Sequence, residues 1–220
     1  MTGANGGASP GRGRVRLLVA LDLPEWVRRE AESWQQEALT DPALRLNHGL
    51  RIILMFLGHR PQREVGRYLE AIRELCASAP APLVELGDVV AKGPTPELPR
   101  VFALPAKSPE AEVLQIGLRS VFTNQGLYIY EPRKRTFWPH LTVARVRTAD
   151  HKSRRPEVVR NLPDRPIPPG LRGPFEGLRV GLYRSEMRPD GARYSLMGKA
   201  DLPGSTYATL NPDDRDNHLD

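Results

Sequence analysis

His140 and Thr142 stand two residues apart in the segment FWPHLTVARVR, Phe137 to Arg147. From the histidine on, the segment alternates as a β-strand does, and residues two apart in a strand point to the same face. An imidazole can take up or release a proton near neutral pH, and a threonine hydroxyl can donate a hydrogen bond. The pair therefore suits an anionic group such as a phosphate, with His140 as general acid or base. A histidine that serves only a local hydrogen bond is the simpler interpretation of so short a motif.

The elements around this pair alternate between strands and helices. Apolar runs predict strands at 14–23, 50–58, 82–90 and 100–105. Helical spacing predicts helices at 24–39, 61–78 and 108–122, the last with Ser108 as its N-cap. A basic, proline-rich loop at 151–174 follows the strand of His140, and 175–202 reads as a hairpin around the turn signal RPDG.

The strand–helix–strand order occurs twice, beginning with RLLVALDLP in one half and with RVFALP in the other. An internal duplication of this kind predicts two similar lobes that face each other. By that repeat, LRIILMFLG at 50–58 corresponds to PHLTVARV. The two strands would then be neighbours, or lie opposite each other across a central cleft.

The composition limits the classes of protein to which the chain can belong. The chain has 220 residues and a net charge of +6, with 40% hydrophobic and 26% charged residues, which is typical of a soluble globular protein. A basic surface suits an anionic partner, most commonly nucleic acid, or serves solubility alone. The single Cys76 excludes a disulfide within the chain and fits a reducing compartment. No run approaches the roughly 18 apolar residues of a membrane span, and we expect a cytoplasmic protein. We expect a disordered leader at 1–13, one domain at 14–203 and a polar flexible tail at 204–220.

Taken together, R-x-F-W-P-H-L-T-V-A-R, the opening RLLVALDLP, FLGHRP after the second strand and the hairpin LYRSEM…GARY carry a resemblance. The chain resembles the 2H phosphoesterase superfamily, and within it the bacterial RNA 2′,3′-cyclic phosphodiesterases, also called 2′-5′ RNA ligases. The resemblance covers roughly residues 14–203. It implies an α+β fold of two pseudo-symmetric lobes, each a mostly antiparallel sheet with helices on the outside, around a central cleft.

The resemblance also implies a mechanism. Two H-x-T/S motifs, one from each lobe, face each other across the cleft, and their histidines bracket a cyclic phosphate. One histidine activates water for attack on phosphorus, the other protonates the departing ribose oxygen, and the hydroxyls hold phosphate oxygens. No metal or other cofactor is implied, and the partner would be an RNA 3′ end or a small cyclic nucleotide. We expect a monomer.

The chain departs from the family pattern at its first motif. His140 and Thr142 match the second motif, but where the family reads L-H-x-T-L-x-F-L-G this chain has Arg51 and Ile53. Arginine cannot act as a general base and is a very poor acid, although it binds phosphate well. Isoleucine donates no hydrogen bond. The loss of one acid–base partner typically costs about 10²–10⁴ in rate.

Other residues near the two motifs are weaker candidates. His48 precedes Arg51 by three residues, an odd offset that points it away from Arg51 in a regular strand unless a bulge at Gly49 turns it inward. His59 is interpreted as an exposed loop histidine. Arg135 can reach a phosphate or remain solvated, and Tyr130 can stack on a base or join the core. The expected site thus has His140, Thr142 and Arg51 as catalytic residues and Arg135, Ile53 and Tyr130 as substrate-binding residues.

Two functions follow from these residues. The first is a metal-independent hydrolase that opens a terminal 2′,3′-cyclic phosphate to a 2′-phosphate, impaired by the altered first motif. The alternative is a catalytically weakened protein on the same fold that binds RNA or nucleotide phosphates. A small cyclic phosphate in place of RNA is a further possibility for the substrate.

Overall fold

The computed structural model has an α+β architecture, as expected, and describes residues 13–95, 97–128, 136–148, 156–160, 166–188 and 191–203. Its strands are β1 (Arg14–Asp22), β2 (Leu44–Leu46), β3 (Ile52–Pro61), β4 (Leu83–Leu86), β5 (Val90–Lys92), β6 (Val101–Lys107), β7 (His140–Val146), β8 (Phe175–Glu176), β9 (Arg179–Arg188) and β10 (Gly191–Asp201). Its helices are α1 (Glu25–Ala38), α2 (Val65–Cys76), α3 (Pro109–Asn124) and the single turn α4 (Pro169–Arg172), with a 3₁₀ turn at Gln62–Glu64.

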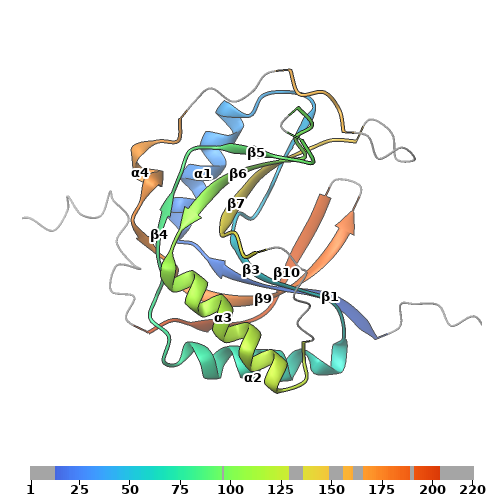
Figure 1. Ribbon diagram of the computed structural model, residues 1–220, viewed down its shortest axis with the longest axis vertical. Coiled ribbons are helices and arrows are strands. Elements are labelled where there is room, and N and C mark those ends of the chain that lie inside the picture. The colour runs from blue at the N-terminus through green and yellow to red at the C-terminus, as the bar shows by residue number, and fades with distance from the viewer. Residues whose placement is uncertain are drawn as a thin grey trace, which may run out of the picture.

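The strands form one curved antiparallel sheet in the order β10-β9-β1-β3-β7-β6-β4-β8, with β2 added to β7 and β5 added to β6. One half consists of β10, β9, β1 and β3, and the other of β7, β6, β4 and β8 (Figure 1). The halves join where Ile52 of β3 pairs with Leu141 of β7. The duplicated strands 50–58 and 140–146 are therefore neighbours, which confirms the first of the two arrangements that the repeat allowed.

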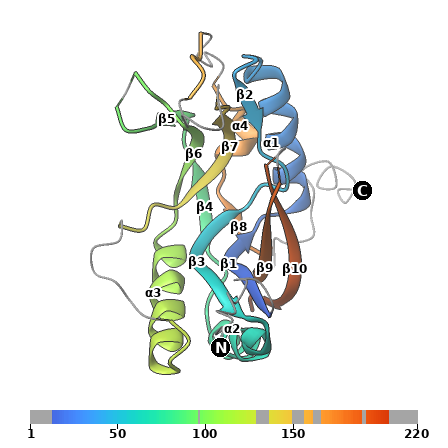
Figure 2. The same cartoon turned by 90° about the vertical axis from the view of Figure 1, so that its right-hand side faces the viewer.

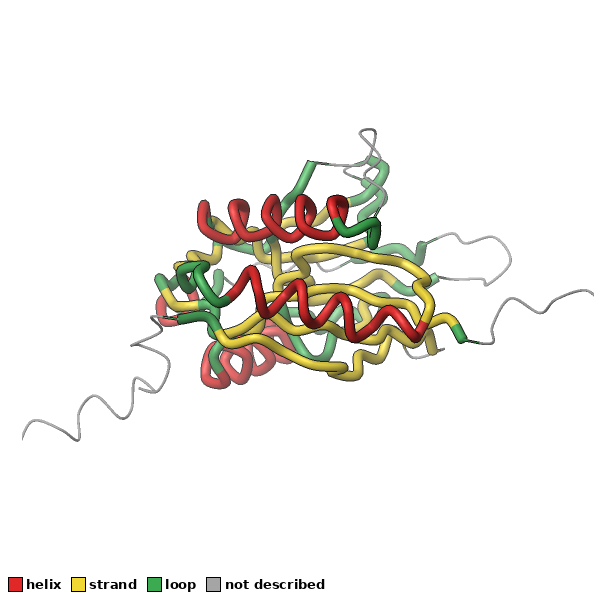
Figure 3. The backbone as a smooth tube through the Cα atoms, turned by 90° about the horizontal axis from the view of Figure 1, so that it is seen from below, coloured by secondary structure: helices red, strands yellow, loops and turns green. Residues whose placement is uncertain are grey.

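The helices lie outside the sheet (Figures 2 and 3). α2 packs on β9 and β10 and against α3, with the rings of Tyr68 and Phe122 in edge contact at 5.0 Å, while α1 contacts β7 and α4. α3 begins as expected, because the Ser108 side chain accepts a hydrogen bond from the backbone nitrogen of Ala111 at 3.2 Å. No helix of the described residues is long and apolar enough to cross a membrane.

The two faces of β1 have different roles. Leu17, Val19 and Leu21 point into the main core, which continues through both halves of the sheet. Leu18 and Ala20 belong to a separate small cluster on the other face, together with Tyr183 of β9. Because β1 lies inside its half of the sheet, side chains of β3, β9 and β10 pack against the face of β1 that carries Leu18 and Ala20.

The sequence-based expectations hold for the main elements and are wrong in detail elsewhere. The strand expected at 82–90 is interrupted at residues 87–89, so β4 and β5 pair separately with β6. The short strands β2 and β8 and the turn α4 were not anticipated, since two to four residues carry no readable periodicity. The expected leader, the expected tail and most of the loop at 149–165 lie outside the described residues.

Candidate functional site

The pairing of β3 with β7 brings the two motif strands together. Ile52 pairs with Leu141 in antiparallel register. Extending this register by one residue in each direction sets Arg51 opposite Thr142 and Ile53 opposite His140. Residues opposite each other in an antiparallel pair point to the same face. All four motif positions therefore share one face of the sheet, as the duplicated sequence indicated.

His140 is the first residue of β7, and its ring is held in a defined state. Its Nδ1 lies 2.7 Å from the carbonyl oxygen of Trp138. A carbonyl can only accept, so in the neutral ring Nδ1 carries the proton and donates it to this bond. Nε2 is then the nitrogen that bears the lone pair. His140 is thus held in the tautomer that a general base requires.

Trp138 contacts His140 a second time, through its ring. The indole and the imidazole are stacked with centroids 4.1 Å apart and planes 19° apart. Burial lowers the pKa of His140, an effect that the bond to Trp138 partly opposes and that the charge of Arg145 reinforces. A lowered pKa keeps the ring neutral at pH 7. The half-site on β7 thus presents a neutral imidazole beside the buried hydroxyl of Thr142, which is 7% exposed.

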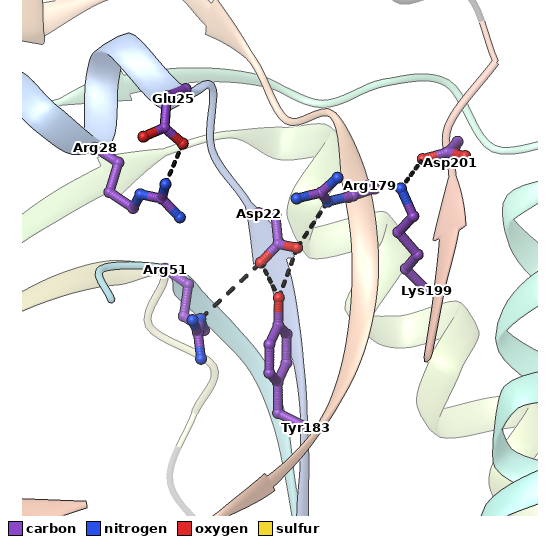
Figure 4. A network of polar contacts seen from close by, with 8 residues as sticks. All are labelled: Asp22, Glu25, Arg28, Arg51, Arg179, Tyr183, Lys199 and Asp201. Atoms are coloured by element: carbon purple, nitrogen blue, oxygen red, sulfur yellow. Dashed lines mark hydrogen bonds and ion pairs between the residues drawn. The ribbon is translucent and has the colours of Figure 1, made fainter. Parts of the chain in front are cut away.

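Arg51 occupies the corresponding place on β3 in a different manner. Its guanidinium carbon lies 4.0 Å from the centroid of the Tyr183 ring and 5.2 Å from that of Tyr194. Its Nε lies 4.0 Å from a carboxylate oxygen of Asp22 (Figure 4). The side chain is 13% exposed, and its Nε and Nη1 are buried with no hydrogen-bond partner among the described residues. Both nitrogens are closed to solvent, so a phosphate can reach them only if the side chain moves, whereas Nη2 is not among these buried atoms.

Asp22, at the end of β1, organises this side of the site. It accepts a hydrogen bond from the Tyr183 hydroxyl at 2.6 Å and one from Arg179 Nε at 3.0 Å (Figure 4). Gly181 makes the first bond possible, since a Cβ there would overlap the Tyr183 ring that leans over it. Burial and the bond to Asp22 raise the pKa of Tyr183, which therefore stays a neutral donor.

Ile53, the other motif position on β3, contributes no polar group to the site. It packs on the small cluster of Leu18, Ala20 and Tyr183. In the family pattern a threonine stands at this position, and its hydroxyl would point to the same face as His140. Here an apolar group covers the floor of the site, so Ile53 can shape a substrate but cannot hold an oxygen.

Of the weaker candidates from the sequence, the structure describes the two histidines His48 and His59. Gly49 has a positive φ of 62°, so the chain does kink there, and the exposed His48 lines one pocket together with Arg51. His59 is exposed, as expected, but it lies in β3, where it pairs with Arg16, and not in a loop. Arg135 and Tyr130 lie outside the described residues. Among the described residues no group of three histidine, cysteine or acidic side chains could hold a metal ion.

Asp22, Tyr183 and Tyr194 were not identified from the sequence as residues of the site, and the stacking of Trp138 on His140 was not anticipated. Asp22 interrupts an apolar strand, and this interruption is the one signal that could have marked it. Nothing in the sequence joins β1 to Tyr183, because their contact depends on the pairing of strands about 160 residues apart.

Comparison with known proteins agrees with the fold, which is that of the 2H phosphoesterases. The chain is 30% identical over 199 residues to a protein of Thermus thermophilus named RNA 2′,3′-cyclic phosphodiesterase, a match that covers 86% of this chain and 91% of the relative. The chain therefore belongs to the RNA 2′,3′-cyclic phosphodiesterase family of 2H phosphoesterases. No protein-family model matches it.

Solved structures agree at the level of the backbone. The crystal structure of TT0787 of Thermus thermophilus has a TM-score of 0.65 and 26% identity, covering 85% of this chain and 97% of that one. Apo LigT of E. coli has a TM-score of 0.64 and 22% identity, covering 86% and 98%. These matches confirm the expected two-lobed fold.

Proposed function

We propose that this protein opens the terminal 2′,3′-cyclic phosphate of RNA to a 2′-phosphate, slowly, with His140 as its one acid–base residue. The observation that carries the proposal is the state of His140. Its Nδ1 is bound to a carbonyl and its pKa is lowered, so its Nε2 is a base at neutral pH. The relatedness to a protein named RNA 2′,3′-cyclic phosphodiesterase supports the choice of substrate.

In the proposed reaction, His140 activates the water molecule that attacks phosphorus. Nε2 of His140 takes a proton from a water molecule while the water oxygen bonds to phosphorus. The bond from phosphorus to the ribose 3′ oxygen breaks, which leaves a 2′-phosphate. Thr142 donates a hydrogen bond to a phosphate oxygen, and Arg51 stabilises the charge that accumulates on the group.

Departure of the ribose 3′ oxygen is the slow part of this reaction. The oxygen departs with a negative charge, and in the family the second histidine protonates it. Arg51 retains its proton at any physiological pH and cannot serve as that acid. The 3′ oxygen must therefore take its proton from water, which costs about 10²–10⁴ in rate relative to a positioned acid. The step uses no metal ion, and a chelator should leave it unchanged.

A second candidate function is favoured by Arg51 itself. Arg51 lines a pocket formed with residues 45–49 and 191–194. A guanidinium in such a pocket can hold a phosphate with no turnover at all. The protein would then bind the 2′,3′-cyclic phosphate end of an RNA, or a nucleotide phosphate, and not hydrolyse it.

Incubation of the purified protein with an oligonucleotide that ends in a 2′,3′-cyclic phosphate tests the proposal. We expect slow formation of the 2′-phosphate, reduced about 10²–10⁴-fold in His140→Ala. His59→Ala is the matched control, since His59 is exposed and away from the motifs. Turnover that survives His140→Ala would show that the mechanism is wrong. Tight binding without turnover in the unmodified protein would select the second candidate.

A further inference from the structure

A basic pocket of about 490 Å³ adjoins the two motifs. It is formed by the segment 45–49, by Arg51 and by residues 191–194 at the start of β10. Arg45, His48, Arg51 and Arg193 contribute to it, and within the described part of the chain none of its lining residues is acidic. Such a one-signed, partly enclosed surface focuses a positive potential that favours an anion.

Two glycines allow the arginines to line this pocket closely. Gly191, with φ of 125°, lies so near Arg45 that a Cβ there would meet the guanidinium carbon at 3.3 Å. Gly49 lies under Arg51 in the same way, with 3.2 Å to Nη2. The two guanidiniums therefore rest on backbone from the β2–β3 segment and from the β9–β10 hairpin. A Cβ at either position would be tight against its arginine, whose guanidinium would have to shift by a few tenths of an ångström.

The position of the pocket relative to His140 follows from strand register. Leu46 pairs with Ala144, and the nitrogen of Asn47 donates to the Val143 carbonyl. The pocket thus extends from beside Thr142 toward the far end of β7. Ala144 is four residues from His140, or roughly 13 Å along a strand. Arg45 pairs one residue further on, with Arg145, so its backbone lies further still from that of His140 along β7.

We propose that this pocket is a second phosphate subsite, which binds a phosphodiester upstream of the reacting end. This inference rests on the proposed function, because it takes the cyclic phosphate to lie at His140 and Thr142. The protein then selects RNA ends that carry internal phosphates over mononucleotide 2′,3′-cyclic phosphates. The ligand class is a single-stranded polyanion whose phosphates bind to Arg45 and Arg193.

Binding measurements in the His140→Ala background test this without turnover. The probes are a labelled tetranucleotide ending in 2′,3′-cyclic phosphate and the corresponding mononucleotide, each measured at several salt concentrations. We expect the tetranucleotide to bind at least about tenfold more tightly. Arg45→Ala combined with Arg193→Ala should remove that difference and lower the salt slope by about 0.7 for each phosphate that is no longer bound.

The controls separate the outcomes. Arg73→Ala, at an exposed position of α2 that does not line the pocket, removes one positive charge as Arg193→Ala does and should have no effect. Arg193 is exposed, so Arg193→Ala alone can replace the double variant if that variant unfolds. Equal affinity for both probes, or an equal loss for both in the variants, would overturn the subsite. Failure of the proposed function would instead appear as absent turnover in the unmodified protein, which this measurement does not use.

Discussion

The two halves of the site share a strand pairing and differ in chemistry. On β7, His140 and Thr142 offer a neutral base and a hydroxyl. On β3, Arg51 and Ile53 stand at the corresponding places and offer a fixed cation and an apolar floor. The backbone that brings the motifs together is therefore maintained independently of the groups that catalyse. In the proposed reaction the fold positions the phosphate, and one side chain in each half determines whether it is hydrolysed.

The β3 half is stabilised by contacts within its own side of the sheet. Arg51 lies on the Tyr183 ring, and Tyr183 is fixed by its hydrogen bond to Asp22. Asp22 also accepts from Arg179, so its charge is shared among three partners. The charge of Arg51 is thus only partly compensated. This agrees with a role in phosphate binding in addition to packing.

Replacement of Thr142 by valine tests the β7 half with little change of shape. We expect kcat/KM to fall by about 10- to 10²-fold, because a hydrogen bond to a charged phosphate oxygen is worth roughly 1.5–3 kcal/mol. Steady-state hydrolysis of the cyclic-phosphate oligonucleotide provides the measurement. Thr123→Val, at an exposed position on α3, is the control. An unchanged rate in Thr142→Val would contradict the phosphate-binding role of the Thr142 hydroxyl, and with it the contrast between the two halves.

Replacement of Tyr183 by phenylalanine tests the β3 half. The ring that contacts Arg51 remains, but the hydrogen bond to Asp22 is removed, and the free energy of unfolding should fall by about 1–2 kcal/mol. Urea denaturation measures this change. Tyr194→Phe is the control, because it keeps the second ring beside Arg51 and removes only a hydroxyl from the half-exposed face of β10. Equal losses in the two variants would contradict the organising role of Asp22.

The pH profile of kcat/KM distinguishes one acid–base group from two. His140 must be neutral to act as base, and burial lowers its pKa. The rate should be constant above about pH 7 and fall as pH drops through that lowered pKa, with no second limb, because Arg51 does not titrate there. Trp138→Leu should move the fall to higher pH as the ring becomes more exposed. A bell-shaped profile in the unmodified protein would reveal a second titrating partner.

The sequence predicted what depends on local pattern and on family resemblance. It located the strands of both motifs and allowed their pairing as one of two arrangements. It did not predict that Arg51 lies between Tyr183 and Tyr194, because that contact requires β1, β3, β9 and β10 to be assembled. It also missed the stacking of Trp138 on His140, since neighbouring positions of an extended segment give no indication of which rings will meet. The charged contacts of Arg51 therefore depend on the pairing of strands that lie far apart in the sequence.

One experiment tests the difference between the two halves most directly. Arg51→His combined with Ile53→Thr gives the β3 strand the family's motif, and the rate of cyclic-phosphate opening is then measured in a single turnover. We expect it to rise by about 10²–10⁴-fold over the unmodified protein and to fall again when His140→Ala is added. A folded double variant that is no faster than the unmodified protein would show that the altered half does not limit the reaction.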